Sequence, residues 1–134
     1  MDDPRGIKID IDLTGDSVVL SVAGEIDMSE APAFEREVLT VLADRPHALV
    51  VDLSAVDFFG SHGISVLLTA LRHALRYGVG FAVVADHRPV RRPLEVTDLA
   101  ETLSLHATLP EALAALEDSA ALTEGSITRH AAQR

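Results

Sequence analysis

Apolar and polar residues alternate strictly at the start of the chain. Isoleucine or leucine stands at every second position from Ile7 to Leu13, with a charged residue between each pair. This period of two predicts a half-exposed strand. Turn-forming residues at 14–17 separate it from a second apolar run at 18–23, so we expect the protein to open with a β-hairpin.

Two longer segments repeat their apolar residues at helical spacing. Residues 30–43 place apolar side chains on one stripe and most of their charged side chains on the other faces. Residues 61–77 carry the clearest helical pattern in the chain, and Gly78 suits the position just after a helix end. The apolar stripe of this second segment consists of Ile64, Leu67, Leu68, Leu71, Ala74 and Leu75.

Short continuous apolar runs predict buried strands at 48–53 and 81–85. Residues 54–60 separate the first of these strands from the helix that begins at Ser61, and we expect them to form a loop. A short helix is expected over 89–97, with Pro93 accommodated inside it.

The end of the chain predicts one more strand, one more helix and a tail. A short strand is expected over 103–105. Thr108 and Glu111 have the spacing of a capping box and open a helix that runs to about Leu116. Residues 119–134 lose apolar periodicity, so we expect a flexible C-terminal tail there.

The predicted order is β-β-α-β-α-β-α-β-α. It indicates a single α/β domain over residues 1–118, with a mixed sheet opened by the N-terminal hairpin and about four packed helices. A chain of 134 residues suits one domain. No apolar run approaches the ~20 residues of a membrane span, and the acidic N-terminus has no apolar signal region. We therefore expect a soluble, cytoplasmic protein that does not bind membranes.

Composition and charge exclude several function classes. The chain has no cysteine, which excludes disulfides and thiolate metal sites. Its net charge is −10, from 21 acidic and 11 basic residues. This charge argues against nucleic-acid binding and favours a basic protein partner. The absence of tryptophan and the single tyrosine argue against an aromatic platform for bases or sugars.

Ser61 carries the most informative candidate chemistry. It lies at the first turn or cap of the predicted helix, where a hydroxyl sits beside unpaired amides and the positive end of the helix dipole. A phosphate on Ser61 would be stabilised by the same groups and would present about −2 charges to a partner. The position also suits a plain N-cap, so the residue pattern alone leaves both roles open.

Other patterns that could carry chemistry are incomplete. Side chains of adjacent helical residues point about 100° apart, so Ser61 and His62 are not expected to form a catalytic dyad. The six histidines contain no metal-binding pair. Gly78 and Gly80 complete no nucleotide-binding motif. We expect no enzymatic activity, no metal and no cofactor.

Two sets of charged residues are also expected to form no catalytic site. Arg88, Arg91 and Arg92 form the only basic cluster, and a solvated helix start is its simplest interpretation, although contact with a partner or a phosphate is an alternative. Asp52 precedes the 54–60 segment and Asp57 lies within it, and neither has a convincing acid–base partner.

Four segments, in order and at fitting spacing, resemble the STAS domain and in particular the bacterial anti-sigma factor antagonists. The resemblance covers about residues 7–116. The segments are 24–27 (Gly-Glu-Ile-Asp), 51–54 (Val-Asp-Leu-Ser), 59–67 (Phe-Gly-Ser-His-Gly-Ile-Ser-Val-Leu) and 90–97 (Val-Arg-Arg-Pro-Leu-Glu-Val-Thr).

The resemblance implies a switch between proteins. Antagonists of this type bind an ATP-dependent kinase-type anti-sigma factor and free its sigma factor, and phosphorylation of a serine at the helix start ends binding. By position that serine is Ser61, and the acidic residue after the second strand is Asp27, expected beside Ser61. Gly60 and His62 replace an aspartate and a serine of the family pattern, which changes the local field around the acceptor.

We therefore expect an anti-sigma factor antagonist, a monomer or weak homodimer, with Ser61 as its phosphorylation site. A nucleotide- or small-ligand-binding STAS sensor, or a scaffold subunit that Ser61 does not regulate, is the alternative. The expected partner-binding residues are Asp27, Asp57, Phe58, Phe59, Gly60, Ser61, His62 and Ser65.

Overall fold

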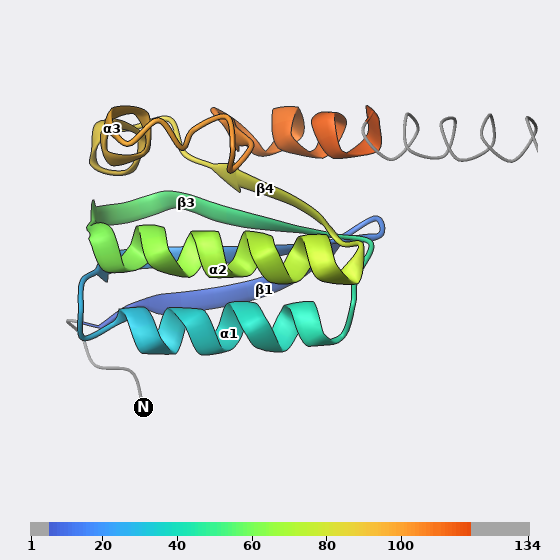
Figure 1. Cartoon of the computed structure of the whole chain (residues 1–134), viewed down its shortest axis with the longest axis horizontal. Coiled ribbons are helices and arrows are strands. Elements are labelled where there is room, and N and C mark those ends of the chain that lie inside the picture. The colour runs from blue at the N-terminus through green and yellow to red at the C-terminus, as the bar shows by residue number, and fades with distance from the viewer. Residues whose placement is uncertain (1–5, 119–134) are drawn as a thin grey trace, which may run out of the picture.

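Five strands form one mixed sheet in the order β1-β2-β3-β4-β5, in a computed structural model that describes residues 6–118 (Figure 1). β1 (Lys8–Thr14) pairs antiparallel with β2 (Ser17–Ile26). The other neighbours pair in parallel, and they are β3 (Ala48–Phe59), β4 (Gly80–Val84) and β5 (Leu105–His106). The predicted hairpin and mixed sheet are confirmed.

Helices alternate with the parallel strands. They are α1 (Ala31–Ala43), α2 (Ser61–Tyr77) and α3 (Arg88–Val96), and residues 109–118 form a further helical segment. Figure 1 shows α1 and α2 side by side, with α3 at the end of the sheet where α2 begins. The predicted tail at 119–134 lies outside the described residues. None of the helices among residues 6–118 combines the length and apolar character that a bilayer crossing requires.

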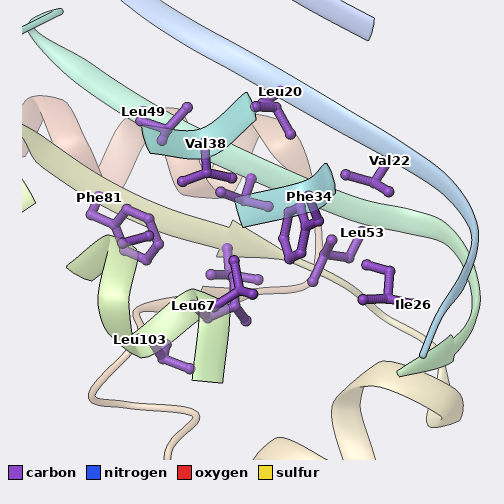
Figure 2. Packing of buried hydrophobic residues seen from close by; sticks show 14 of the residues in the cluster. Leu20, Val22, Ile26, Phe34, Val38, Leu49, Leu53, Leu67, Phe81 and Leu103 are labelled. Carbon is purple, nitrogen blue, oxygen red and sulfur yellow. The ribbon is translucent and has the colours of Figure 1, made fainter. Parts of the chain in front are cut away.

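Apolar side chains are buried on both faces of the central strands. The larger cluster joins one sheet face to α1, α2 and α3. Figure 2 shows labelled residues of this cluster from the sheet, α1 and α2. The smaller cluster joins the other face to the helical segment 109–118 through Ala112 and Leu116. Four consecutive residues, Ala48 to Val51, are buried, which is the expected pattern for a parallel strand covered on both sides.

The prediction of a loop at 54–60 is wrong, because β3 continues to Phe59. Its second half pairs with the end of β2, from Ala23 opposite Ala55 to Ile26 opposite Phe59. The pairing contains two register shifts, and each shift breaks the alternation by which a strand is recognised from sequence. The extension carries β3 to the residue immediately before Gly60.

The shorter predicted elements are close to their expected places. The last strand is shifted to 105–106, because Ser104 has a left-handed backbone with φ of 56° and ends a turn there. α3 accommodates Pro93, which lacks an amide proton and so leaves only the carbonyl of Pro89 without its usual helical donor. The amide of Glu111 donates to the Thr108 hydroxyl at 3.3 Å, which confirms the predicted cap.

Candidate functional site

The carboxyl ends of β2 and β3 lie side by side and place two candidate residues on one edge of the sheet. Ile26 and Phe59 form the last pair of the two strands, and the amide of Gly60 donates to the Ile26 carbonyl at 3.4 Å. Asp27 and Ser61 follow directly on these two chains. The structure therefore brings together two residues that are 34 positions apart in sequence.

Ser61 is the first residue of α2 and its side chain is exposed. Gly60 is the N-cap, in extended conformation, so the interpretation of Ser61 as the N-cap is wrong and its placement in the first turn is confirmed. Within residues 6–118 the Ser61 hydroxyl forms no hydrogen bond. An added phosphoryl group therefore has access to this oxygen from solvent.

The first turn of α2 offers unpaired donors. The first backbone bond inside the helix runs from the amide of Ile64 to the Gly60 carbonyl at 3.2 Å. The amides of the three preceding residues therefore have no acceptor within the helix. No acidic residue in this first turn compensates the helix dipole. The helix end itself therefore favours an anion on Ser61.

Gly63 fixes the first turn against the core. A Cβ atom at this position would lie 2.5 Å from Cε1 of the Phe59 ring, so only glycine allows the helix to approach so closely. Phe59 itself is only 3% exposed. Phe59 was expected to contact a partner, and the structure places its ring beneath α2 instead, where it supports the turn that carries Ser61.

Asp27 holds the start of α1. Its Oδ1 accepts hydrogen bonds from the amides of Ser29 at 3.0 Å and Glu30 at 3.1 Å. Its backbone carbonyl accepts a bond from the amide of Ala31 at 3.0 Å. The exposed carboxylate therefore has a defined orientation at the edge of the site, because it holds the turn at 27–30 that leads into α1, whose N-cap is Glu30.

Exposed carboxylates accumulate around the two strand ends. Glu25 lies on β2, Asp57 lies on β3 and Asp27 follows β2, and all three are exposed. Among residues 6–118 none of them takes part in an ion pair. This edge therefore carries uncompensated negative charge, which favours a partner with basic side chains.

A groove of about 350 Å³ lies between the first turns of α1 and α2. Met28, His62 and Ser65 line it together with residues of α1. His62 and Ser65 are exposed, as the partner-binding prediction requires, and Met28 is 69% exposed. Met28 was missed in the sequence because a single apolar residue in a short turn carries no periodic signal.

A second groove, of about 550 Å³, lies on the other side of Gly60, between β3 and α3. It is lined by Phe58, Phe59, Arg88, Pro89, Arg92, Pro93 and Val96. Phe58 is 49% exposed there, in agreement with its predicted place on the surface. A partner contact by Arg88 and Arg92 was one alternative expected from the sequence, whereas Pro89, Pro93 and Val96 were missed, although they have helical spacing.

Residues 6–118 contain no cluster of histidine and acidic side chains suited to a metal.

Most of the predicted partner-binding residues lie at one end of the sheet. They are Asp27, Asp57, Phe58, Gly60, Ser61, His62 and Ser65.

Comparisons with known proteins identify a family and similar proteins for this chain. The sequence profile described as the STAS domain matches residues 8–112. The chain is 41% identical over 113 residues to the anti-sigma-F factor antagonist RsfB of Mycobacterium tuberculosis, covering 84% of this chain and 92% of that protein.

Solved structures show the same fold. A crystal structure of an anti-sigma factor antagonist from Mycobacterium paratuberculosis superposes with a TM-score of 0.78 at 40% identity, covering 87% of this chain and 99% of that chain. The unphosphorylated form of the anti-sigma factor antagonist SpoIIAA superposes with a TM-score of 0.68, covering 83% and 97% of the two chains. At 17% identity the second likeness concerns the fold alone.

Proposed function

The chain belongs to the STAS domain family, and we propose that within it this protein acts as an anti-sigma factor antagonist. In this role it binds an anti-sigma factor and so frees the sigma factor that the anti-sigma factor holds. The relatives named above are antagonists of this kind. The observation that carries the proposal is the Ser61 hydroxyl at the first turn of α2, which is exposed and forms no hydrogen bond with another described residue.

The docking surface is the end of the sheet around Ser61. It comprises the loop at Asp27, the exposed end of β3 at Asp57 and Phe58, and the outer side of the first α2 turns. Its uncompensated carboxylates call for basic residues on the anti-sigma factor. Each carboxylate would attract basic side chains of the partner that face this edge. The attraction would mainly orient the partner and raise the association rate.

Phosphorylation of Ser61 provides the switch. The anti-sigma factor is of the ATP-binding kinase type and transfers the γ-phosphoryl group of ATP to the Ser61 oxygen, with ADP as the leaving group and loss of the hydroxyl proton. The new dianion is stabilised within the free protein by the amides and dipole of α2. In the complex the same group occupies space and must be desolvated against the partner, so binding is lost.

Two residues adapt this switch to the chain. Gly60 places no carboxylate directly before the acceptor, so the developing phosphate meets less repulsion there than an aspartate would cause. His62 is exposed on the next position of the helix, where a protonated imidazole would interact favourably with a nearby phosphate.

Phosphorylation is tested with the purified chain, ATP and kinase-type anti-sigma factors of the same genome, with the M. tuberculosis anti-sigma-F factor included. Mass spectrometry should find one phosphate on a peptide that contains Ser61, and none in Ser61→Ala. A phosphate elsewhere, or none with any anti-sigma factor that binds the chain, would contradict the switch.

Binding is tested with charge variants of equal size. Ser61→Glu should bind the anti-sigma factor at least tenfold more weakly than wild type, while Ser61→Ala should bind normally. Thr40→Glu adds the same charge at an exposed position of α1 away from the site and should also bind normally. Tight binding of a purine nucleotide in calorimetry without any protein partner would instead favour a ligand-binding module.

A further inference from the structure

The groove between β3 and α3 has apolar walls that are fixed in place. The inner side of α3 is anchored because Val90 and Leu94 are fully buried. The ring Nε2 of His87, the residue before α3, lies 2.6 Å from the Val56 carbonyl on β3. Both sides of the groove are thus attached to the same strand, so the groove exists before any partner arrives.

Apolar side chains of this groove remain open to solvent. Val96 is 70% exposed, and Phe58 presents about half of its surface. Pro89 and Pro93 lie on the same wall and have no amide proton, so this side of the helix offers few backbone donors to water. Exposed apolar surface gathered in one place is typical of a surface that another chain covers.

The charge of the groove is opposite to that of the neighbouring edge. Arg88 and Arg92 are exposed at its margin, and neither forms an ion pair with another residue in the described range 6–118. Arg91 differs from both, because it donates to the Ala85 carbonyl at 2.8 Å and pairs with Glu95 at 3.4 Å. Two uncompensated cations in a chain of net charge −10 favour an acidic ligand.

The groove is continuous with the docking surface around Ser61. The Phe58 ring lies 3.3 Å from the position that a Gly60 Cβ would occupy, so the aromatic wall borders the residue just before Ser61. A partner that covers Ser61 could therefore also contact Phe58, because the two residues border the same glycine.

From these observations we infer that the groove binds a segment of the anti-sigma factor that carries an apolar side chain next to acidic residues. The apolar side chain packs between Phe58 and Val96, and the carboxylates pair with Arg88 and Arg92. This inference rests on the proposed function and adds a second half to the interface. The Ser61 half is acidic and recognises basic partner residues, whereas the α3 half is apolar and basic.

Charge reversal tests this inference in the full-length chain. Arg88→Glu/Arg92→Glu should weaken binding of the anti-sigma factor at least tenfold, with an intermediate loss for Arg88→Gln/Arg92→Gln. The effect should be larger at low salt, because exposed charges are screened at high salt. Arg72→Glu/Arg76→Glu makes the same change in charge on exposed positions of α2, at least about 16 Å along the helix axis from Ser61, and should lose less than threefold.

The apolar wall is tested separately. Phe58→Ala should weaken binding at least fivefold, and Val96→Ser gives a second reading at a position so exposed that folding is unaffected. Thermal unfolding of each variant checks that the chain is folded. Reversal of Arg88 and Arg92 without loss of affinity, in a wild-type chain that does bind, would overturn this inference alone. Failure of the wild type to bind any kinase-type anti-sigma factor would overturn the proposed function and this inference together.

Discussion

Helix α2 has a glycine next to each end, and the two ends are built for different purposes. At the carboxyl end Gly78 adopts a left-handed conformation with φ of 71°. The amide of Gly78 donates to the Leu75 carbonyl at 3.4 Å, and the amide of Val79 donates to the Ala74 carbonyl at 2.9 Å. At the amino end the N-cap Gly60 is extended and has no side chain with which to cap the helix.

Charge follows the same division. Arg76 stands in the last turn, where a cation interacts favourably with the helix dipole. The guanidinium of Arg45 lies 4.7 Å from the centre of the Tyr77 ring and joins the loop after α1 to this end. The first turn has no acidic residue, and its serine forms no hydrogen bond within the part of the chain that the structure describes. The completed end stabilises the fold, and the uncompensated end is available to a partner or a phosphate.

The largest effect is expected where the amino end touches the core. Gly63→Val should lower the free energy of unfolding by about 3 kcal/mol, because the added carbons overlap the buried Phe59 ring. Urea unfolding measures the change. Ser65→Val, an exposed position two residues later, should change stability by less than about 0.5 kcal/mol. Equal losses for both variants would mean that the Phe59 contact does not position the first turn.

The two terminal glycines should respond differently to alanine. Gly78→Ala should cost about 1 to 2 kcal/mol, since a Cβ is strained in the left-handed conformation. Gly60→Ala should cost less, because its φ of −102° suits any residue and only the half-exposed Phe58 ring must adjust. Chemical denaturation of both variants compares them. A larger loss at Gly60 would contradict the division between the two ends.

A smaller effect is expected at the neighbouring loop. Asp27→Ala should cost about 1 kcal/mol, because the amides of Ser29 and Glu30 lose their acceptor. Asp57→Ala removes an exposed carboxylate that forms no side-chain hydrogen bond within residues 6–118, and should change stability by less than about 0.5 kcal/mol. Matching losses in thermal unfolding would show that the Asp27 carboxylate does not stabilise the turn that leads into α1.

The smallest effect has the opposite sign. Ser61→Asp should raise the free energy of unfolding by about 0.3 to 1 kcal/mol, because a negative charge at this terminus complements the dipole. Arg76→Glu should lower it by a similar amount at the other terminus. Both changes should shrink at high salt, and urea unfolding at two salt concentrations checks this. A destabilised Ser61→Asp would show that the first turn does not accommodate an anion.

Local patterns predicted the regular elements well for a physical reason. The stripe of α2 and the apolar run at 48–53 are determined by burial on a single period, so they can be read in one dimension. The position of Gly78 also follows from local conformation. The placement of Ser61 in the first turn and the proximity of β2 and β3 ends follow from the order of elements and from the family resemblance.

The rest depends on pairing between distant residues. Two register shifts against β2 decide that Phe59 is buried and Phe58 is half exposed, and no pattern within 54–60 records those shifts. The groove at α3 likewise requires that a helix beginning at Arg88 pack beside the end of β3. Such contacts between separate elements are the part that one sequence read alone does not determine.

The contact between Gly63 and the Phe59 ring has a consequence for the proposed recognition of Ser61. Ser61 owes its position to a buried aromatic ring and to the paired ends of two strands, so its surroundings exist only in the folded chain. A synthetic peptide with the sequence of residues 57–67 would contain the same amino acids without the folded conformation. We expect an enzyme or antibody that recognises the native surface not to bind this peptide. Recognition of this kind depends on tertiary structure, so a partner would not bind a misfolded molecule of this protein.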